Sequence, residues 1–157
     1  MELLANEHIE LLERLTEASV DFILIGGYSV VYYGYSRTTN DMDLWLKPDN
    51  LNKIKFLNAM KNYGIHQSDL SRLEQIDFRQ TNMFFVGKEP VKVDFLTHVV
   101  GVNWDEAIKK VAFLSVKNFR IPVVDYDDLI TMKMLSSRLK DKADVEELQK
   151  INKYKKI

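Results

Sequence analysis

Residues 22–46, FILIGGYSVVYYGYSRTTNDMDLWL, constrain the fold more than any other stretch of this 157-residue chain. The apolar run at the start predicts a short buried strand that ends in a pair of glycines. Residues 27–34 predict a short helix, because a glycine pair suits a tight strand-to-helix turn, although their composition alone favours a strand. A polar loop then leads to Asp41 and Asp43, at the start of a second predicted strand.

The rest of the chain mixes helical and strand patterns, which predicts an α/β or α+β fold. The predicted helices are residues 3–18, residues 49–63, a segment beginning near Ser68, residues 103–111, and residues 125–151 with a break near Lys140 and Asp141. The predicted strands are two in residues 82–97, around a Gly-Lys-Glu-Pro turn, and one or two in residues 113–125. The apolar stripe of the helix at 49–63 is expected to consist of Leu51, Ile54, Leu57, Ala59 and Met60.

Composition and charge are those of an ordinary globular domain. Hydrophobic residues make up 46% of the chain and charged residues 29%, and we expect residues 1–157 to form a single domain that is long enough to bury a core. The net charge of −1 gives no overall basic field for nucleic acid, and the absence of cysteine excludes disulfides and thiolate zinc sites. The start of the chain does not resemble a signal peptide and no apolar run is long enough for a membrane span, so we expect a cytoplasmic protein.

The two closely spaced aspartates suggest a metal site. Side chains alternate along a strand, so Asp41 and Asp43 share a face, with Cα atoms about 6–7 Å apart. Carboxylates this close repel each other, and a divalent cation would offset the repulsion. With no cysteine and no nearby histidine, the oxygen ligands favour Mg²⁺ or Mn²⁺ over zinc. Asp94 lies opposite the apolar residues of its predicted strand, so it is the candidate third carboxylate that would allow a second ion.

The glycine pair, Gly26 and Gly27, predicts an anion site. A strand that ends in glycine and leads into a helix lets the backbone approach a ligand and directs N–H groups and the helix dipole toward it. Ser29 in the first helical turn would add a hydroxyl donor. Such a turn suits a phosphate, and a phosphate site beside metal ligands is the minimum for nucleotide chemistry. The chain has neither a P-loop nor a G-x-G-x-x-G motif.

Taken together, these motifs resemble the DNA polymerase β-like nucleotidyltransferase superfamily over residues 20–150. The signature of that superfamily is a glycine pair, a spacer, an Asp-apolar-Asp motif and a third aspartate on a later strand, matched here by IGGYSVVYYGYSRTTNDMDLWL and VKVDFL. Arg37, Thr39 and the late segment MKMLSSRLKDKADVEEL look more like the small bacterial branch, which includes minimal nucleotidyltransferases and abortive-infection toxins. The late positions that match this branch are Lys133, Arg138, Lys140, Asp141 and Asp144.

The resemblance implies a nucleotidyltransferase fold, a mixed sheet flanked by helices with helices at the C-terminus. It implies that two Mg²⁺ or Mn²⁺ ions bind to Asp41, Asp43 and Asp94 and hold the triphosphate of an NTP. The nucleotide-binding residues it implies are Gly26, Gly27, Ser29, Arg37 and Lys133. An acceptor hydroxyl on a protein, an RNA such as tRNA or a small molecule would attack the α-phosphorus near Asp94, and pyrophosphate would leave. An antitoxin or another protein is the implied regulatory partner.

Structural explanations compete with each of these assignments. Asp41 could cap a turn, Asp43 and Asp94 could be solvated surface acids, the glycines could form a plain turn, and Ser29 could be an ordinary helix residue. Arg37 could pair with a nearby acid, and Lys133 could lie on a solvated helix face. An intrahelical charge network could account for Arg138, Lys140, Asp141 and Asp144. Another function class is an interaction protein that keeps the fold without catalysis, and a third is a metal-dependent phosphohydrolase. The complete set of three carboxylates favours nucleotidyl transfer.

Overall fold

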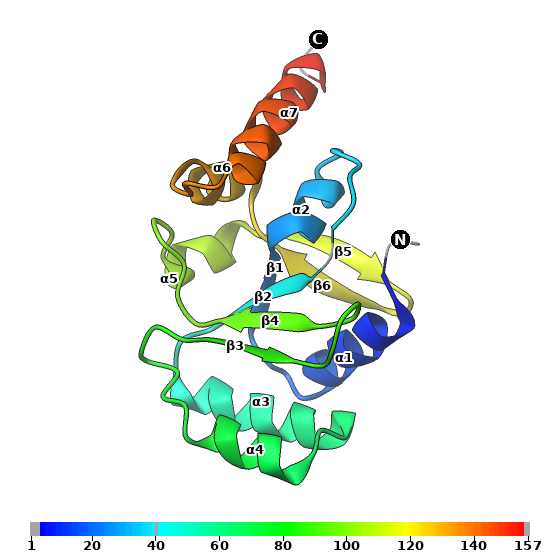
Figure 1. The fold of residues 1–157 in the computed structure, drawn as a ribbon, viewed down its shortest axis with the longest axis vertical. Helices are drawn as coiled ribbons and strands as arrows, with labels where there is room; N and C mark the ends of the chain where they lie inside the picture. Colours follow the sequence, from blue (N-terminus) through cyan, green and yellow to red (C-terminus); the bar gives the residue numbers. More distant parts are fainter. Residues whose placement is uncertain (1–3, 40, 156–157) are drawn as a thin grey trace.

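A mixed β-sheet flanked by helices forms the centre of the molecule, which confirms the predicted α+β class and is consistent with a nucleotidyltransferase fold (Figure 1). The computed structural model describes residues 4–39 and 41–155, in which six strands follow the order β3-β4-β2-β1-β6-β5. None of the helices in these two ranges is both long and apolar enough to pass through a membrane.

The elements are, in chain order, α1 (Asn6–Glu17), β1 (Phe22–Ile25), α2 (Gly26–Tyr32), β2 (Met42–Leu46), α3 (Asn50–Tyr63), α4 (Gln67–Glu74), β3 (Met83–Val86), β4 (Val93–Leu96), α5 (Trp104–Ala107), the 3-10 helix η1 (Ile108–Lys110), β5 (Ala112–Val116), β6 (Phe119–Val123), α6 (Tyr126–Met134) and α7 (Leu139–Lys155). The short helix expected after the glycine pair is confirmed as α2, and the late strand segment forms two strands, β5 and β6. The first helix begins at Asn6, and Leu3, where it was expected to begin, lies outside the described residues.

The break in the C-terminal helical segment lies earlier than predicted. Helix α6 ends at Met134 and α7 begins at Leu139, so Lys140 and Asp141 lie in the first turn of α7 and the predicted break at these residues is wrong. The Ser136 hydroxyl accepts a hydrogen bond from the backbone N–H of Arg138 at 3.1 Å. A side-chain acceptor at this position favours a turn over a continuous helix, which explains the earlier break.

The buried face of α3 also differs from the prediction. Leu51 and Ile54 are 67% and 63% exposed, whereas Asn52 and Phe56 are buried with Ala59 and Met60. Asn52 is buried because its amide bonds the backbone of Asp21, accepting from the N–H at 2.8 Å and donating to the carbonyl at 2.9 Å. This bonding joins α3 to the segment that enters β1, so a polar residue takes a position that hydropathy alone assigns to the surface.

Helices cover both faces of the sheet. One face packs against α1, α3 and α4, and the other packs against α5, α6 and α7, as the two helical layers in Figure 1 show. Strand β1 contributes alternate residues to the two cores and is buried along its whole length. On β2, Trp45 packs edge-to-face on Trp104 of α5, with ring centroids 5.2 Å apart. Asp43, two residues before Trp45, shares its face, so this carboxylate lies on the side of α5–α7.

Candidate active site

Parallel pairing of β2 with β4 brings two of the predicted acids together. Asp43 of β2 and Asp94 of β4 are partners in the register, so their side chains are neighbours on one face, with Cα atoms about 4.8 Å apart. Burial first, and the charge of Asp94 next, raise the pKa of Asp43 to about 6. A raised pKa means that the charged form of the carboxylate is disfavoured. A bound cation would stabilise that charged form.

Asp41 lies just before β2 and contacts the same group of acids through a lysine. The ammonium of Lys92 is 3.4 Å from Asp41 Oδ2 and 3.4 Å from Asp94 Oδ1. Lys92 was not predicted to take part, although it lies two residues before Asp94 and therefore on the same face of the strand. A cationic side chain thus already bridges two of the three carboxylates.

The donor atoms at this position fit Mg²⁺ or Mn²⁺. All three acids offer oxygen ligands, and Asp41 Oδ1 is buried without a hydrogen-bond partner among the described residues. No three His, Cys, Asp or Glu side chains within residues 4–39 and 41–155 are already gathered around a single ion position. Metal binding would therefore require the Lys92 ammonium to move away from Asp41 and Asp94.

The glycine pair makes room for side chains of the site. Gly26 has φ +70°, and a Cβ at this position would overlap the carboxylate of Asp43. A Cβ on Gly27 would overlap the hydroxyl of Thr39. Ser29 is fully buried and its hydroxyl donates to the Gly26 carbonyl at 2.6 Å, so it supports the turn from within.

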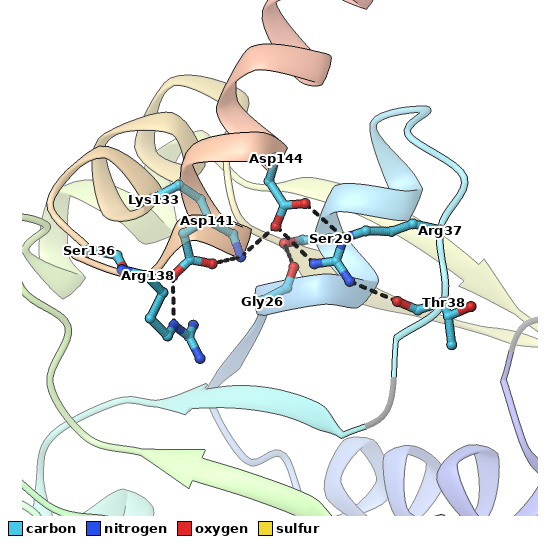
Figure 2. A network of polar contacts seen from close by, with 9 residues as sticks. All are labelled: Gly26, Ser29, Arg37, Thr38, Lys133, Ser136, Arg138, Asp141 and Asp144. Atoms are coloured by element: carbon cyan, nitrogen blue, oxygen red, sulfur yellow. Dashed lines mark hydrogen bonds and ion pairs between the residues drawn. The ribbon is translucent and has the colours of Figure 1, made fainter.

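A network of ion pairs connects the loop after α2 with α6 and α7, as Figure 2 shows. Arg37 donates two hydrogen bonds of 2.8 Å to Asp144, and Lys133 Nζ lies 2.7 Å from Asp141 and 3.1 Å from Asp144. Arg138 donates to Asp141 at 2.9 Å. The interpretation of the late charges as an intrahelical network is therefore wrong, because Arg138 lies just before α7 and the other bonds join different elements.

Burial distinguishes the members of this network. The side chains of Lys133, Asp141 and Asp144 are 8%, 3% and 1% exposed, whereas Arg138 is 74% exposed. Desolvation alone would raise the pKa of Asp141, but hydrogen bonds from Lys133, Ser136 and Arg138 and the charge of Lys133 lower it to about 2. The buried pairs are ionic contacts that hold α6, α7 and the loop after α2 together.

These groups surround a polar cavity of about 180 Å³. Its lining residues are Gly27, Arg37, Thr39, Asp41, Asp43, Asp94, Lys133, Arg138, Lys140 and Asp141. Of the predicted site residues, only Gly26 and Ser29 are absent from this wall, and Gly26 lines an adjoining cavity. A larger cavity, about 690 Å³, lies away from these acids between β3 and the α3–α4 pair. The polar cavity therefore combines acids that suit a cation with basic groups that suit an anion.

Comparison with known families supports a nucleotide-related role. The model of a family described as "Nucleotidyl transferase of unknown function (DUF2204)" matches residues 5–157, which includes every residue of the cavity wall. No curated protein matches the chain.

Proposed function

The chain belongs to this nucleotidyl transferase family, and from that premise we propose that it transfers a nucleoside monophosphate from an NTP to an acceptor hydroxyl. The observation that carries the proposal is the Asp43–Asp94 pair, set across two parallel strands at the wall of a cavity that basic side chains also line. Paired carboxylates next to cationic groups suit a substrate that brings both metal ions and phosphates.

Asp41, Asp43 and Asp94 would hold two Mg²⁺ or Mn²⁺ ions. When bound, the ions would supply Lewis-acid stabilisation of the charge that develops on the phosphoryl oxygens. Asp94 has the further role of receiving the proton of the acceptor hydroxyl. In the overall step, the acceptor oxygen forms a bond to the α-phosphorus, the bond between that phosphorus and the bridging oxygen to the β-phosphate breaks, and pyrophosphate leaves with the electron pair.

The basic groups of the cavity would bind the triphosphate in two different ways. Lys140 is exposed on the first turn of α7, and Arg138, just before that helix, is exposed although it is bonded to Asp141, so both can turn toward phosphate oxygens at the surface. Arg37 and Lys133 are already bonded to Asp144 and Asp141, so their orientation is set before a ligand arrives. Gly27 would let the backbone approach the ligand, and Gly26 and Ser29 would shape the turn behind it.

The acceptor and the regulation of the enzyme are further parts of the proposal. The acceptor hydroxyl would belong to a protein, an RNA or a small molecule, and an antitoxin-like protein would control the activity in the cytoplasm. This extension depends on the resemblance of Arg37, Lys133 and residues 138–144 to the small bacterial branch. Retention of the fold without catalysis is the weaker alternative, because all three carboxylates are present and adjacent to the cavity.

Two measurements test the proposed function. Calorimetry with an α,β-methylene NTP should show binding that requires Mg²⁺ and is lost in Asp43→Asn, while Asp105→Asn, an exposed acid on α5, should bind normally. Incubation with NTPs labelled at either the α- or the γ-phosphate, in the presence of protein and RNA acceptors, should transfer only the α-label. Transfer of the γ-label, or binding that is indifferent to Mg²⁺ and to Asp43→Asn, would contradict the proposal.

A further inference from the structure

A second cavity, of about 460 Å³, adjoins the polar one. The two cavities share five wall residues, Asp43, Asp94, Lys133, Arg138 and Asp141. The predicted metal-binding acids therefore stand between two spaces, and a ligand held at these acids would extend into both. A volume of this size falls within the range of about 300–1,000 Å³ that is usual for small-molecule sites.

The outer wall of the second cavity is apolar and unusually exposed. Met83 of β3 is 69% exposed, Val100 of the loop after β4 is 77% exposed, and Leu135 after α6 is 56% exposed. These side chains come from three separate segments and meet around one space next to charged groups. Exposed apolar side chains that gather in this way mark a surface that a ligand covers.

The loop that carries Val100 is held against the end of α6. Val99 and Val102 form a β-bridge, and Gly101 between them has φ +82°. A Cβ on Gly101 would overlap the side chain of Leu135, so the backbone of the loop packs directly on that residue. The apolar wall is thus built by specific packing.

We propose that this second cavity holds the nucleoside of the NTP, an inference that rests on the proposed function and deepens it. The α-phosphorus is the atom that joins the triphosphate to the nucleoside, and it is also the atom that reacts. With this atom at Asp43 and Asp94, the triphosphate extends into the polar cavity, with its Arg37, Lys133 and Lys140, and the nucleoside extends into the apolar one.

The apolar wall also carries a group able to bond the edge of a base. His98 lines the cavity, and its Nδ1 lies 3.1 Å from the hydroxyl of Thr97. Its other ring nitrogen, Nε2, is the hydrogen-bonding group that would meet a base edge. Apolar side chains against the faces of a planar ring, with few polar contacts at its edge, are the usual composition of such a site.

The first test compares ligands with and without a nucleoside. Calorimetry in the presence of Mg²⁺ measures Kd for inorganic triphosphate and for the α,β-methylene derivatives of ATP, GTP, CTP and UTP. At least one nucleotide should bind about tenfold or more tightly than inorganic triphosphate, because burial of a base adds apolar contact. If every nucleotide binds no more tightly than triphosphate, the inference is overturned while the proposed function stands. If none of these probes binds, the proposed function itself fails.

The second test identifies the cavity. The double variant Met83→Gln with Leu135→Gln should weaken binding of the preferred nucleotide about tenfold and leave the Kd for inorganic triphosphate unchanged, because the apolar contact is lost. Met134→Gln is the matched control, since Met134 is 63% exposed, precedes Leu135 and lies outside the wall, and it should change neither Kd. Met83→Gln alone, at a position of the edge strand, serves if the double variant does not fold.

Three results of the second test would overturn the inference. The first is an unchanged Kd for the nucleotide with an unchanged KM for the acceptor, which would show that the nucleoside lies elsewhere. The second is an equal loss of affinity for the nucleotide and for inorganic triphosphate, which would show that the apolar wall makes no contact specific to the nucleoside. The third is an unchanged Kd for the nucleotide together with a raised KM for the acceptor in the α-label transfer, which would assign the cavity to the acceptor.

Discussion

Replacing Asp144 with asparagine tests the importance of the ion network that joins α7 to the cavity. The Asp144 carboxylate is 1% exposed, receives two 2.8 Å hydrogen bonds from Arg37 and lies 3.1 Å from the Lys133 ammonium. Asparagine keeps the shape, but it has a single acceptor oxygen and its amide N–H groups face a guanidinium. Asp144→Asn therefore leaves buried positive charge without its counter-charge.

The expected loss of stability follows from the burial of the three groups. Removing one partner of a buried ion pair costs about 3–5 kcal/mol. Lys133 keeps a second partner, Asp141 at 2.7 Å, and Arg37 is 12% exposed, so the loss should fall at the low end, about 3 kcal/mol. With a urea m-value of about 2 kcal/mol/M, the midpoint of unfolding should fall by about 1.5 M.

Equilibrium unfolding in urea at pH 7 measures this shift, since urea does not screen charge. Glu147→Gln is the matched control, because it makes the same acid-to-amide change on α7 in an exposed pair with Lys150 at 3.5 Å. The control should lose less than about 0.5 kcal/mol. The double variant Arg37→Met with Asp144→Leu should recover much of the loss, because it removes the uncompensated charge. A midpoint for Asp144→Asn equal to that of the control would refute the assignment of a structural role to this network.

Three further predictions concern the turn, the bridging lysine and acid stability. Gly26→Ala should weaken binding of a Mg²⁺–NTP analogue at least tenfold in calorimetry, because the added Cβ overlaps Asp43. Gly64→Ala is the control, since Gly64 also has a positive φ but no atom lies near its Cβ. This control should cost about 1 kcal/mol of stability and leave binding unchanged. Lys92→Met should tighten binding of Mg²⁺ alone by about threefold to tenfold, because the ammonium competes for Asp41 and Asp94, and unchanged or weaker binding would contradict this competition. The pKa of Asp141 is lowered from 3.8 to about 2 in the folded state, so its contribution to stability is present above pH 4 and is lost as the pH falls toward 2. The stability difference between the native chain and Asp141→Asn should shrink over that range, and a constant difference would be evidence against the lowered pKa.

Local patterns of the sequence were sufficient to predict the elements around the acids. The strand that ends in two glycines, the short helix after it and the strand around Asp43 each depend on apolar residues and turn chemistry within a few positions. Alternation along β4 also identified Asp94 as a polar position of its strand. The adjacency of Asp43 and Asp94 is a property of strand order and register, because β4 pairs in parallel with β2 across the intervening residues 47–92.

Residues that act across elements were not predictable in the same way. Arg37 and Asp144 are 107 positions apart, and each carries the ordinary signal of an exposed charge. Lys133 lies between two methionines and Arg138 follows two serines, but the buried partners of Lys133 come from α7, so the local sequence does not reveal them. The prediction that Leu51 and Ile54 face the core was wrong for a related reason. The hydrogen bonds of Asn52 to Asp21 determine which side of α3 is buried.

The charge arrangement of the site indicates that metal ions and NTP should bind cooperatively. Without ligand, Lys92 is paired with Asp41 and Asp94, and Lys133 is paired with Asp141. A metal ion alone must displace Lys92 from these acids, and an NTP alone must bring its phosphates next to the carboxylates of the cavity. Bound together, each ligand offsets the charge of the other, so each should raise the affinity for the other by the same factor. Under the proposed function, this reciprocity would keep the carboxylates paired with lysine until a complete metal–nucleotide complex enters the cavity.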